Sequence, residues 1–237
     1  MSLILLIETS TAVCSVALAK DDRILAIQHI LDPKSQASRL APTIQMLLND
    51  QGYTLSLCDA VAVSAGPGSY TGLRVGVSTA KGLCFGSGKP LIAINSLDIL
   101  AQNCIDLLDQ NSKGLYAFPP HTLVVPMMDA RRMEVYTARY QMDGTALSAP
   151  QAMIVDLHSF DDILQKGLVI FTGDGVQKCS PLLSHPHAHI EPLSPSASGM
   201  RIAAQRAFQT KDFVNLAYFE PFYLKDFVAG VSKKGVF

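Results

Sequence analysis

The first part of the chain alternates between short apolar runs and polar breaks. Residues 2–10 (SLILLIETS) are an apolar run that ends in polar residues, which is typical of a buried strand leading into a loop. Residues 14–31 hold two β-rich runs about an Asp-containing turn at residues 20–23, which predicts a hairpin. Between residues 35 and 49 the apolar positions recur at helical spacing, although Pro42 must lie near the start of that helix or kink it. The pattern therefore predicts three strands and then a helix.

Strands and helices continue to alternate up to about residue 108. A buried strand is predicted at residues 58–64 and stops at Gly66-Pro67-Gly68. The elements expected after this break are a helix at residues 70–85, a strand at 91–95 and a helix at 97–108 capped by Ser96. A polar stretch then closes the first half near residue 113.

The second half of the chain has a similar order of elements. Strands are expected at residues 122–128, 133–144 and 168–172, followed by a loop at 185–199 and a helix at 199–208. Two α/β halves predict a duplicated architecture, with an N-terminal domain at residues 1–108 and a C-terminal domain at 109–237. The final helix either stays with the second domain or packs back on the first.

Composition favours a protein of the cytoplasm that does not bind nucleic acid by itself. No apolar run reaches the roughly 20 residues of a membrane span, and the N-terminal LILLI is too short for a signal peptide. Five cysteines without a CxxC pair indicate reduced, buried thiols. The formal net charge is −1, and the local basic concentrations are Arg131-Arg132 and Lys233-Lys234. If RNA is involved, another protein is expected to make most of the phosphate contacts.

A glycine-rich loop between the strand and the helix of residues 61–83 is the first candidate site. It matches neither a Walker A loop nor GxGxxG, but a strand–loop–helix unit presents free backbone N–H groups to an anion. A carboxyl and two hydroxyl groups also end the first strand, where α/β folds hold ligands. The weak nucleotide-binding candidates are Glu8, Thr9, Ser10, Gly66, Gly68 and Ser69. A tight turn with local caps explains the same residues without any ligand.

The helix after this loop carries small residues on one face. Gly72, Gly76, Thr79 or Ala80, and Leu83 follow each other at helical spacing. A glycine inside a helix costs about 1 kcal/mol relative to alanine, so two glycines need a packing reason. Either the protein's own sheet or a partner's helix can approach this face, and the pattern alone favours the sheet.

Two polar clusters in the second half receive structural interpretations. His185, His187 and His189 alternate in a proline-rich loop without a matching carboxylate or cysteine motif, so an exposed run is favoured and no metal site is predicted. In the segment at residues 128–136, Asp129 is expected to pair with Arg131 or Arg132 and fix the loop.

Four segments of this sequence resemble the bacterial TsaB family: LILLIETSTAVCSVAL, AVSAGPGSYTGLRVGVSTAKGL, PLIAINSLDIL and PMMDARRMEVYTA. The resemblance covers nearly the whole chain. It implies an α/β fold of two actin-like domains (the ASKHA, ribonuclease H-like class), each a mixed sheet flanked by helices. It also implies a scaffold or activator subunit for making N6-threonylcarbamoyladenosine beside the tRNA anticodon. The implied partners are TsaD, in a heterodimer, and the ATPase TsaE, with a homodimer when TsaD is absent and tRNA contacted indirectly.

The resemblance places the TsaD contact on the glycine-rich helix and the helix before it. The implied partner-interface residues are Arg39, Thr43, Met46, Tyr70, Thr71, Gly72, Leu73, Gly76, Thr79, Ala80 and Leu83. TsaD carries an HxxxH metal motif where this chain has Ser96 and Leu100, and these two side chains cannot replace imidazoles around a transition metal. No catalytic residue is therefore expected.

Departures from the family pattern bear on nucleotide binding. Glu8 stands where the family usually has aspartate, and Gln36 where a histidine is frequent. The longer carboxylate weakens the case for ATP with Mg²⁺ on this chain alone, and leaves ATP or ADP with Mg²⁺ at the interface of the complex. The alternative is a small ATPase or metal-dependent, glycoprotease-like hydrolase that uses Glu8, the glycine loop and Gly173-Asp174-Gly175 as a nucleotide clamp.

Overall fold

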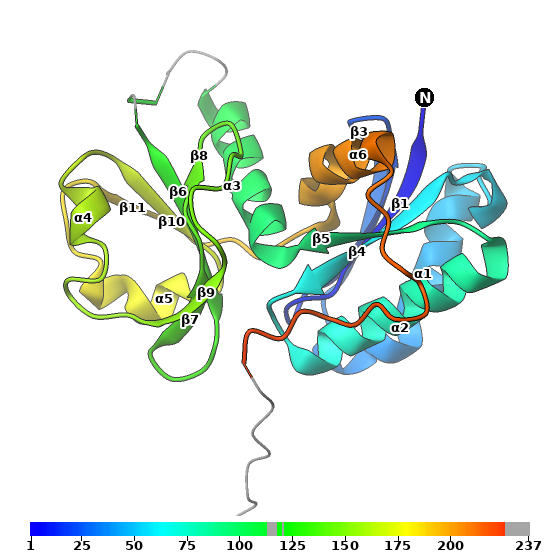
Figure 1. Ribbon diagram of the computed structural model, residues 1–237, viewed down its shortest axis with the longest axis horizontal. Coiled ribbons are helices and arrows are strands. Elements are labelled where there is room, and N and C mark those ends of the chain that lie inside the picture. Colours follow the sequence, from blue (N-terminus) through cyan, green and yellow to red (C-terminus); the bar gives the residue numbers. More distant parts are fainter. Residues whose placement is uncertain (113–117, 120, 226–237) are drawn as a thin grey trace, which may run out of the picture.

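The computed structural model describes residues 1–112, 118–119 and 121–225, which form two lobes (Figure 1). The basic pair Lys233-Lys234 lies outside the described residues. Within those limits, no helix is long and apolar enough to cross a membrane.

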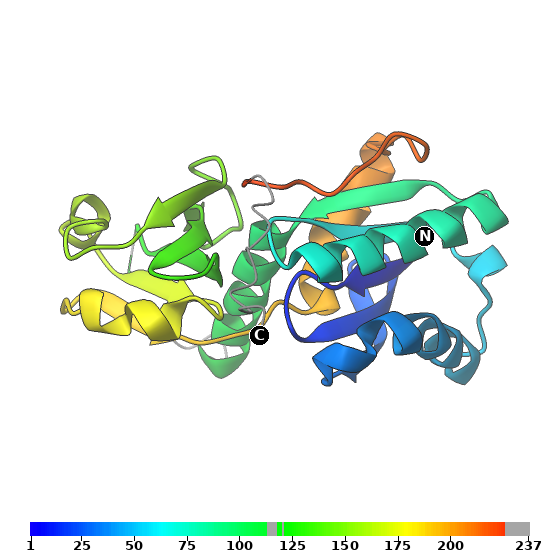
Figure 2. The ribbon, with the colours of Figure 1, turned by 90° about the horizontal axis from the view of Figure 1, so that it is seen from below.

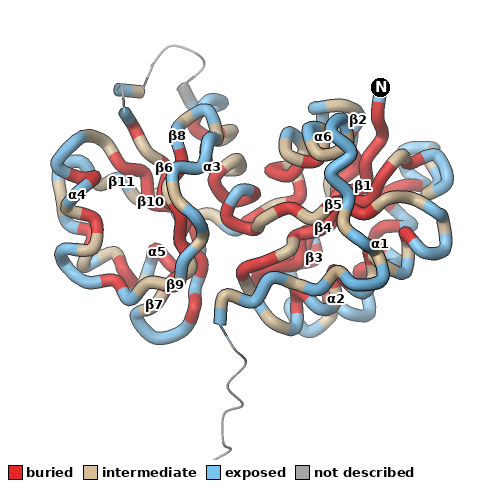
Figure 3. Tube along the Cα trace, viewed as in Figure 1, coloured by how far each residue is buried: buried red, intermediate tan, exposed pale blue. Residues whose placement is uncertain are grey.

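Five strands form the sheet of the first lobe. They are β1 (Leu3–Glu8), β2 (Cys14–Lys20), β3 (Arg23–Ile30), β4 (Ala60–Gly66) and β5 (Leu91–Asn95). Their order is β3-β2-β1-β4-β5, with β1, β4 and β5 parallel and β2 antiparallel to both of its neighbours, β1 and β3. Strands β1 and β4 are almost wholly buried because helices cover both faces of the sheet (Figure 3). The hairpin expected from the sequence is confirmed.

The sheet of the second lobe repeats this strand order. It contains β6 (Leu123–Asp129), β7 (Glu134–Thr137), β8 (Tyr140–Gln141), β9 (Gln151–Ile154), β10 (Val169–Thr172) and β11 (Ala188–Glu191). The order β11-β10-β6-β7-β9 places parallel strands β6, β10 and β11 beside an antiparallel pair, as in the first lobe. The α/β fold of two mixed sheets is confirmed. The sequence missed β9 and β11, and the single strand expected at residues 133–144 is two short strands.

Helices cover the sheet of the first lobe on both faces. One face packs against α1 (Gln36–Asp50) and α2 (Tyr70–Ser87), whose core includes Leu5, Leu40 and Val77. The opposite face packs against α6 (Arg201–Thr210) and the turn before it, through Ala197, Met200 and Ala204. The last helix among the described residues thus lies on the first sheet.

A long helix, α3 (Ser96–Ser112), lies between the lobes and packs mainly on the second sheet (Figure 1). Its first turn is capped by Asn95, whose side-chain oxygen accepts the Leu97 N–H at 2.8 Å. The expectation that Ser96 caps this helix is therefore wrong, and the Ser96 hydroxyl is buried without a hydrogen-bond partner. The short helices α4 (Asp161–Leu164) and α5 (Val176–Cys179) cover the other face of the second sheet.

The glycine face of α2 packs against the end of the protein's own first strand. A Cβ atom on Gly72 would overlap the Thr9 carbonyl oxygen, and one on Gly76 would overlap the Thr9 hydroxyl. Leu73 and Ala80 are also fully buried. The expectation that these four residues offer a free surface to a partner is therefore wrong, because the close approach made by the glycines serves the internal core.

Substitutions on the two sides of α2 should act in opposite directions. Gly76→Leu should lower the free energy of unfolding by about 3 kcal/mol, because a side chain at that position overpacks a core in which Thr9 is fixed. Gly82→Ala should raise it by about 1 kcal/mol, because its Cβ meets no atom within 4 Å and alanine favours the helix. Urea denaturation of both variants measures these changes. A Gly76→Leu protein as stable as the wild type would contradict the packing described.

Candidate functional site: an interdomain cleft and a helical face

A cleft of about 930 Å³ lies between the two lobes. The loops after β1 and β4 and the first turn of α2 form its wall on the first lobe. The β6–β7 turn and Asp174 form its wall on the second lobe, and residues 222–225 lie across it. The loop that follows β1 is joined to the glycine loop by a hydrogen bond of 2.7 Å from the Ser69 N–H to the Ser10 carbonyl.

The structure separates the nucleotide-binding candidates into two groups. Ser10, Gly68, Ser69 and Asp174 line the cleft, whereas Glu8, Thr9, Gly66, Gly173 and Gly175 do not. Gly173 and Gly175 pack against the Met127 carbonyl, and Gly66 lies under the Phe222 carbonyl. These three glycines therefore serve close packing of the chain on itself.

Glu8 is fully buried beneath the cleft. Its Oε1 atom accepts the Ser10 N–H at 2.5 Å, while its Oε2 atom has no hydrogen-bond partner. Burial raises the pKa of Glu8 from 4.5 to about 7, against the opposing effect of the Ser10 and Ser64 hydrogen bonds. The carboxyl group is thus protonated up to near neutral pH, and it does not line the cleft.

The carboxylates around the cleft do not fit a Mg²⁺ site. Magnesium requires oxygen ligands open to an octahedral shell with several waters. Glu8 is covered, Asp129 forms an ion pair with Lys178, and Asp174 accepts the Asp129 N–H at 3.0 Å. Among the residues described, no three His, Cys, Asp or Glu side chains come together as a metal-binding group.

In the turn between β6 and β7, Asp129 does not form the ion pair expected from the sequence. The Lys178 ammonium, rather than an arginine side chain, binds Asp129, and the Arg131 contribution is its backbone N–H at 2.8 Å. Although partial burial opposes it, these two donors lower the pKa of Asp129. Arg131 and Arg132 both adopt left-handed backbone conformations, with φ of 70° and 52°. This conformation is unfavourable for residues with a Cβ atom, and the hairpin enforces it.

Three of the eleven predicted partner contacts, Arg39, Met46 and Thr71, are exposed on α1 and α2, and Thr79 is half-buried. Tyr70 and Leu83 are also half-buried, but Tyr70 contacts the Tyr223 ring and Leu83 packs against the core of the first lobe. Thr43, which was also predicted as a contact, is 8% exposed and belongs to the core side of α1.

Other exposed residues of α2 were missed by the sequence reasoning. They are Arg74, Ser78, Gly82, Phe85 and Gly86. Ser78, Gly82 and Gly86 recur every four residues, so this second small-residue ridge was visible as a pattern. Added Cβ atoms on Gly82 and Gly86 would meet no atom within 4 Å. We call the exposed positions 71, 74, 78, 82, 85 and 86 the outer ridge of α2.

The positions that correspond to the HxxxH motif lie in the core. Ser96 and Leu100 are both fully buried. Leu100 packs between α3 and the second sheet, so close to Gly173 that a Cβ there would lie 2.9 Å from the leucine side chain. An alkyl group fills the place where the motif would present an imidazole.

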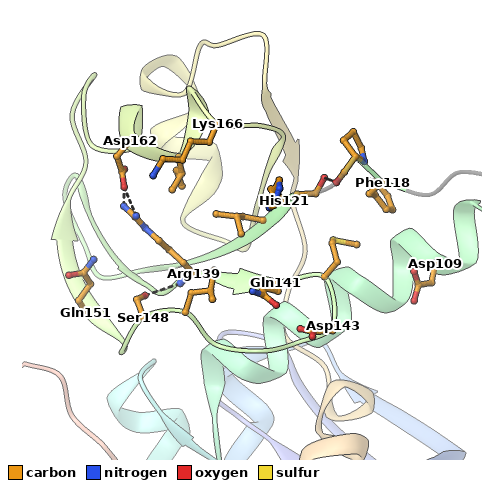
Figure 4. A pocket seen from close by; sticks show the side chains of 16 residues that line it. Asp109, Phe118, His121, Arg139, Gln141, Asp143, Ser148, Gln151, Asp162 and Lys166 are labelled. Atoms are coloured by element: carbon orange, nitrogen blue, oxygen red, sulfur yellow. Dashed lines mark hydrogen bonds and ion pairs between the residues drawn. The ribbon is translucent and has the colours of Figure 1, made fainter.

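A larger hollow of about 1210 Å³ lies on the second lobe (Figure 4). Arg139 and Asp162 form a two-pronged ion pair across it, with Nη2 donating to Oδ1 at 3.0 Å. Lys166, Asp143 and apolar side chains such as Leu147 also line it. The charges are of both signs and do not converge on one point, so the lining indicates no ligand class.

The three alternating histidines make different contacts and do not converge on one point. His187 hydrogen-bonds through Nδ1 to the Leu164 carbonyl at 2.8 Å, and His189 lies 3.7 Å from Glu191. The His185 Nδ1 atom accepts the His187 N–H at 3.1 Å. These contacts join a strand and its preceding turn to the lobe and are not a metal site.

The buried Glu8 carboxyl predicts a pH dependence of stability. Between pH 4.5 and about 7 the unfolded chain loses this proton while the folded chain keeps it, so stability falls as the pH rises through this window. Glu8→Gln keeps the acceptor for Ser10 and cannot ionise. The variant should match the wild type at pH 4 and exceed it by about 3 kcal/mol at pH 8, measured by denaturant unfolding. Parallel pH profiles would show that Glu8 is not buried as described.

Comparison with known proteins agrees with this architecture. Residues 33–233 match the family model described as TsaD, tRNA N6-adenosine threonylcarbamoyltransferase. The chain is 31% identical over 233 residues to the Escherichia coli (strain K12) tRNA threonylcarbamoyladenosine biosynthesis protein TsaB, covering 95% of this chain and 96% of that protein. It is 36% identical over 138 residues to the Bacillus subtilis (strain 168) protein of the same name, covering 58% of this chain and 55% of that one.

A solved structure shares the fold along nearly the whole chain. YeaZ from Pseudomonas aeruginosa superposes with a TM-score of 0.77 at 29% identity, covering 94% of this chain and 100% of that one. The resemblance seen in the four sequence segments is therefore confirmed by the whole-length identity and by the family model. The chain belongs to the TsaB family.

Proposed function

We propose that this chain is a non-catalytic subunit of the cytoplasmic machinery that makes tRNA threonylcarbamoyladenosine. It binds TsaD through the outer ridge of α2 and the exposed face of α1, and holds TsaD in its active form. Its similarity to proteins named for this biosynthesis supports the pathway. The observation that carries the proposed binding mode is the pair of exposed helical glycines, Gly82 and Gly86.

These two glycines have no role inside the folded chain. Gly82 costs about 1 kcal/mol relative to alanine because it lies in the helix interior, and Gly86 lies in the last turn, where this cost is smaller. Neither has a neighbour that a Cβ would strike. Gly72 and Gly76, on the other side of the same helix, do have such a neighbour in Thr9. A partner's helix that packs closely along α2 would supply the missing reason for Gly82 and Gly86, because small residues let two backbones approach.

Large exposed side chains lie on the ridge itself and on α1. Phe85 is 84% exposed at the end of α2, and Met46 is 48% exposed on α1. Arg39 adds a charged group on the same face of α1 as Met46. Aromatic residues, methionine and arginine are the residue types enriched in protein interfaces, so the composition of this face suits a partner protein.

The net charge supports a role as a partner of TsaD, with TsaD itself as the subunit that binds tRNA. With a formal net charge of −1, this chain offers few phosphate contacts, and TsaD would hold the tRNA and carry out the transfer from threonylcarbamoyl-AMP. TsaE would join the pair, and any ATP or ADP with Mg²⁺ would lie at the interface of the complex. The buried Glu8 and the paired Asp129 weigh against the alternative of an ATPase or hydrolase acting through this cleft.

A leucine on the outer ridge should break the complex without unfolding the chain. Gly82→Leu puts a large side chain where the partner helix would approach, and should weaken TsaD binding at least about tenfold in isothermal titration, equivalent to about 1.4 kcal/mol. Synthesis of modified tRNA by the mixture with TsaE and threonylcarbamoyl-AMP should fall in parallel. The unfolding midpoint should not fall, since leucine favours the helix more than glycine.

The matched control is Arg206→Leu on α6, which adds an exposed leucine on the opposite face of the first sheet. This variant should bind TsaD like the wild type. Wild-type affinity of the Gly82→Leu variant would overturn the proposed binding mode. Loss of binding in both variants would contradict it too, because the effect of Gly82→Leu would then not be specific to the outer ridge.

A further inference from the structure

The C-terminal strap (residues 211–225) runs from α6 along α2 to the cleft (Figures 1 and 2). The Val214 N–H donates to the Leu91 carbonyl at 3.0 Å, which joins the strap to the edge of the first sheet. The Lys81 ammonium on α2 donates to the carbonyls of Ala217 and Phe219, at 3.2 and 3.0 Å. Val214, Leu216 and Phe219 pack against the core of the first lobe. The first two thirds of the strap are thus fixed to the first lobe alone.

The end of the strap is seated at the mouth of the cleft. The Phe222 N–H donates to the Ala65 carbonyl at 2.7 Å, and the Phe222 carbonyl covers Gly66 so closely that a Cβ there would overlap it. The Tyr223 ring lies 5.0 Å from the Tyr70 ring, between centroids. The Arg74 guanidinium sits 4.1 Å above the Tyr70 ring and donates to the Tyr223 hydroxyl at 3.3 Å. Backbone and side-chain contacts therefore hold the same short segment.

The strap then crosses to the second lobe. The Lys225 ammonium forms an ion pair with Glu134, the first residue of β7. Both residues line the cleft, as do Phe222 and Tyr223. Within the described residues, other links between the lobes run through α3, for example the ion pair of Arg201 with Asp106 and the 2.8 Å bond from the Ser196 N–H to Asn103. The strap provides a second connection, at the mouth of the cleft.

Two-domain clefts are commonly closed by a ligand that contacts both domains. In this chain the carboxylates around the cleft do not fit Mg²⁺, and residues 222–225 contact both lobes at the position such a ligand would bridge. We propose that the C-terminal strap is a built-in closing element, which sets the angle between the lobes without a bound small molecule. This inference shares Tyr70 and Arg74 with the proposed TsaD contact, but it concerns the chain alone and its test is made without TsaD, so the two proposals can fail separately.

Removing the end of the strap should open the lobes. A chain that stops after Pro221 loses the Ala65, Tyr70, Arg74 and Glu134 contacts, but keeps the apolar part of the strap that stabilises the first lobe. The matched control stops after Lys225 and keeps every one of these contacts. Circular dichroism and urea denaturation establish that both truncated chains are folded.

The opening can be measured as a distance between spin labels. Cysteines introduced at the exposed positions Ala37 and Gln165 place one label on each lobe. The five native cysteines are buried, and burial raises the pKa of each thiol, so they should react slowly with the label. Double electron–electron resonance should give a longer and broader distance distribution for the chain that stops after Pro221. The chain that stops after Lys225 should match the full chain.

Point variants test the contacts that hold the end of the strap at the cleft. Tyr223→Ala removes the ring contact with Tyr70 and the hydrogen bond from Arg74, and should shift the distribution in the same direction. Tyr218→Ala, on the same strap but 84% exposed, should leave it unchanged. Identical distributions for the two truncated chains would overturn the proposal, as would a shortened distance when Mg²⁺ and ADP are added to the full chain.

Discussion

The contact between α2 and the end of β1 is the constraint on which the rest of this structure depends. Gly72 and Gly76 allow the helix to lie directly on Thr9, and no other residue type has room there. This contact fixes the rotation of α2, so that Ser78, Gly82 and Gly86 must face outward. It also places the first turn of α2 beside Ser10, where the two loops form one wall of the cleft. One close approach thereby determines both the cleft and the outer ridge.

The cleft and the exposed face of α1 and α2 have different roles in this account. The carboxylates in and below the cleft are not free to bind a ligand: Glu8 is buried, Asp129 binds Lys178, and Glu134 binds Lys225 of the strap. The exposed apolar groups Met46 and Phe85 and the unopposed glycines lie on α1 and α2. In our account the cleft maintains the shape of the subunit, and the helices present that shape to another protein.

Much of the architecture could be predicted from the sequence, because strands and helices of the first half have strong periodicity. The strands β9 and β11 could not, since each has four residues and β11 lies among prolines and histidines. For α2, periodicity groups Gly72 with Gly76 and Gly82 with Gly86, but does not say which pair meets the sheet. The strap was missed because its contacts are non-local: Lys225 and Glu134 are 91 residues apart in sequence. Spacing along a chain carries no information about such pairs.

Hydroxyl-radical footprinting of the chain, alone and saturated with TsaD, tests the central claim most directly. Met46 and Phe85 are 48% and 84% exposed on the proposed contact face, and Met133, 39% exposed on the second lobe, serves as the internal reference. We predict that Met46 and Phe85 lose most of their oxidation in the complex while Met133 is oxidised as before. Unchanged oxidation of Met46 and Phe85 at saturation would contradict the assignment of α1 and α2 as the surface that binds TsaD.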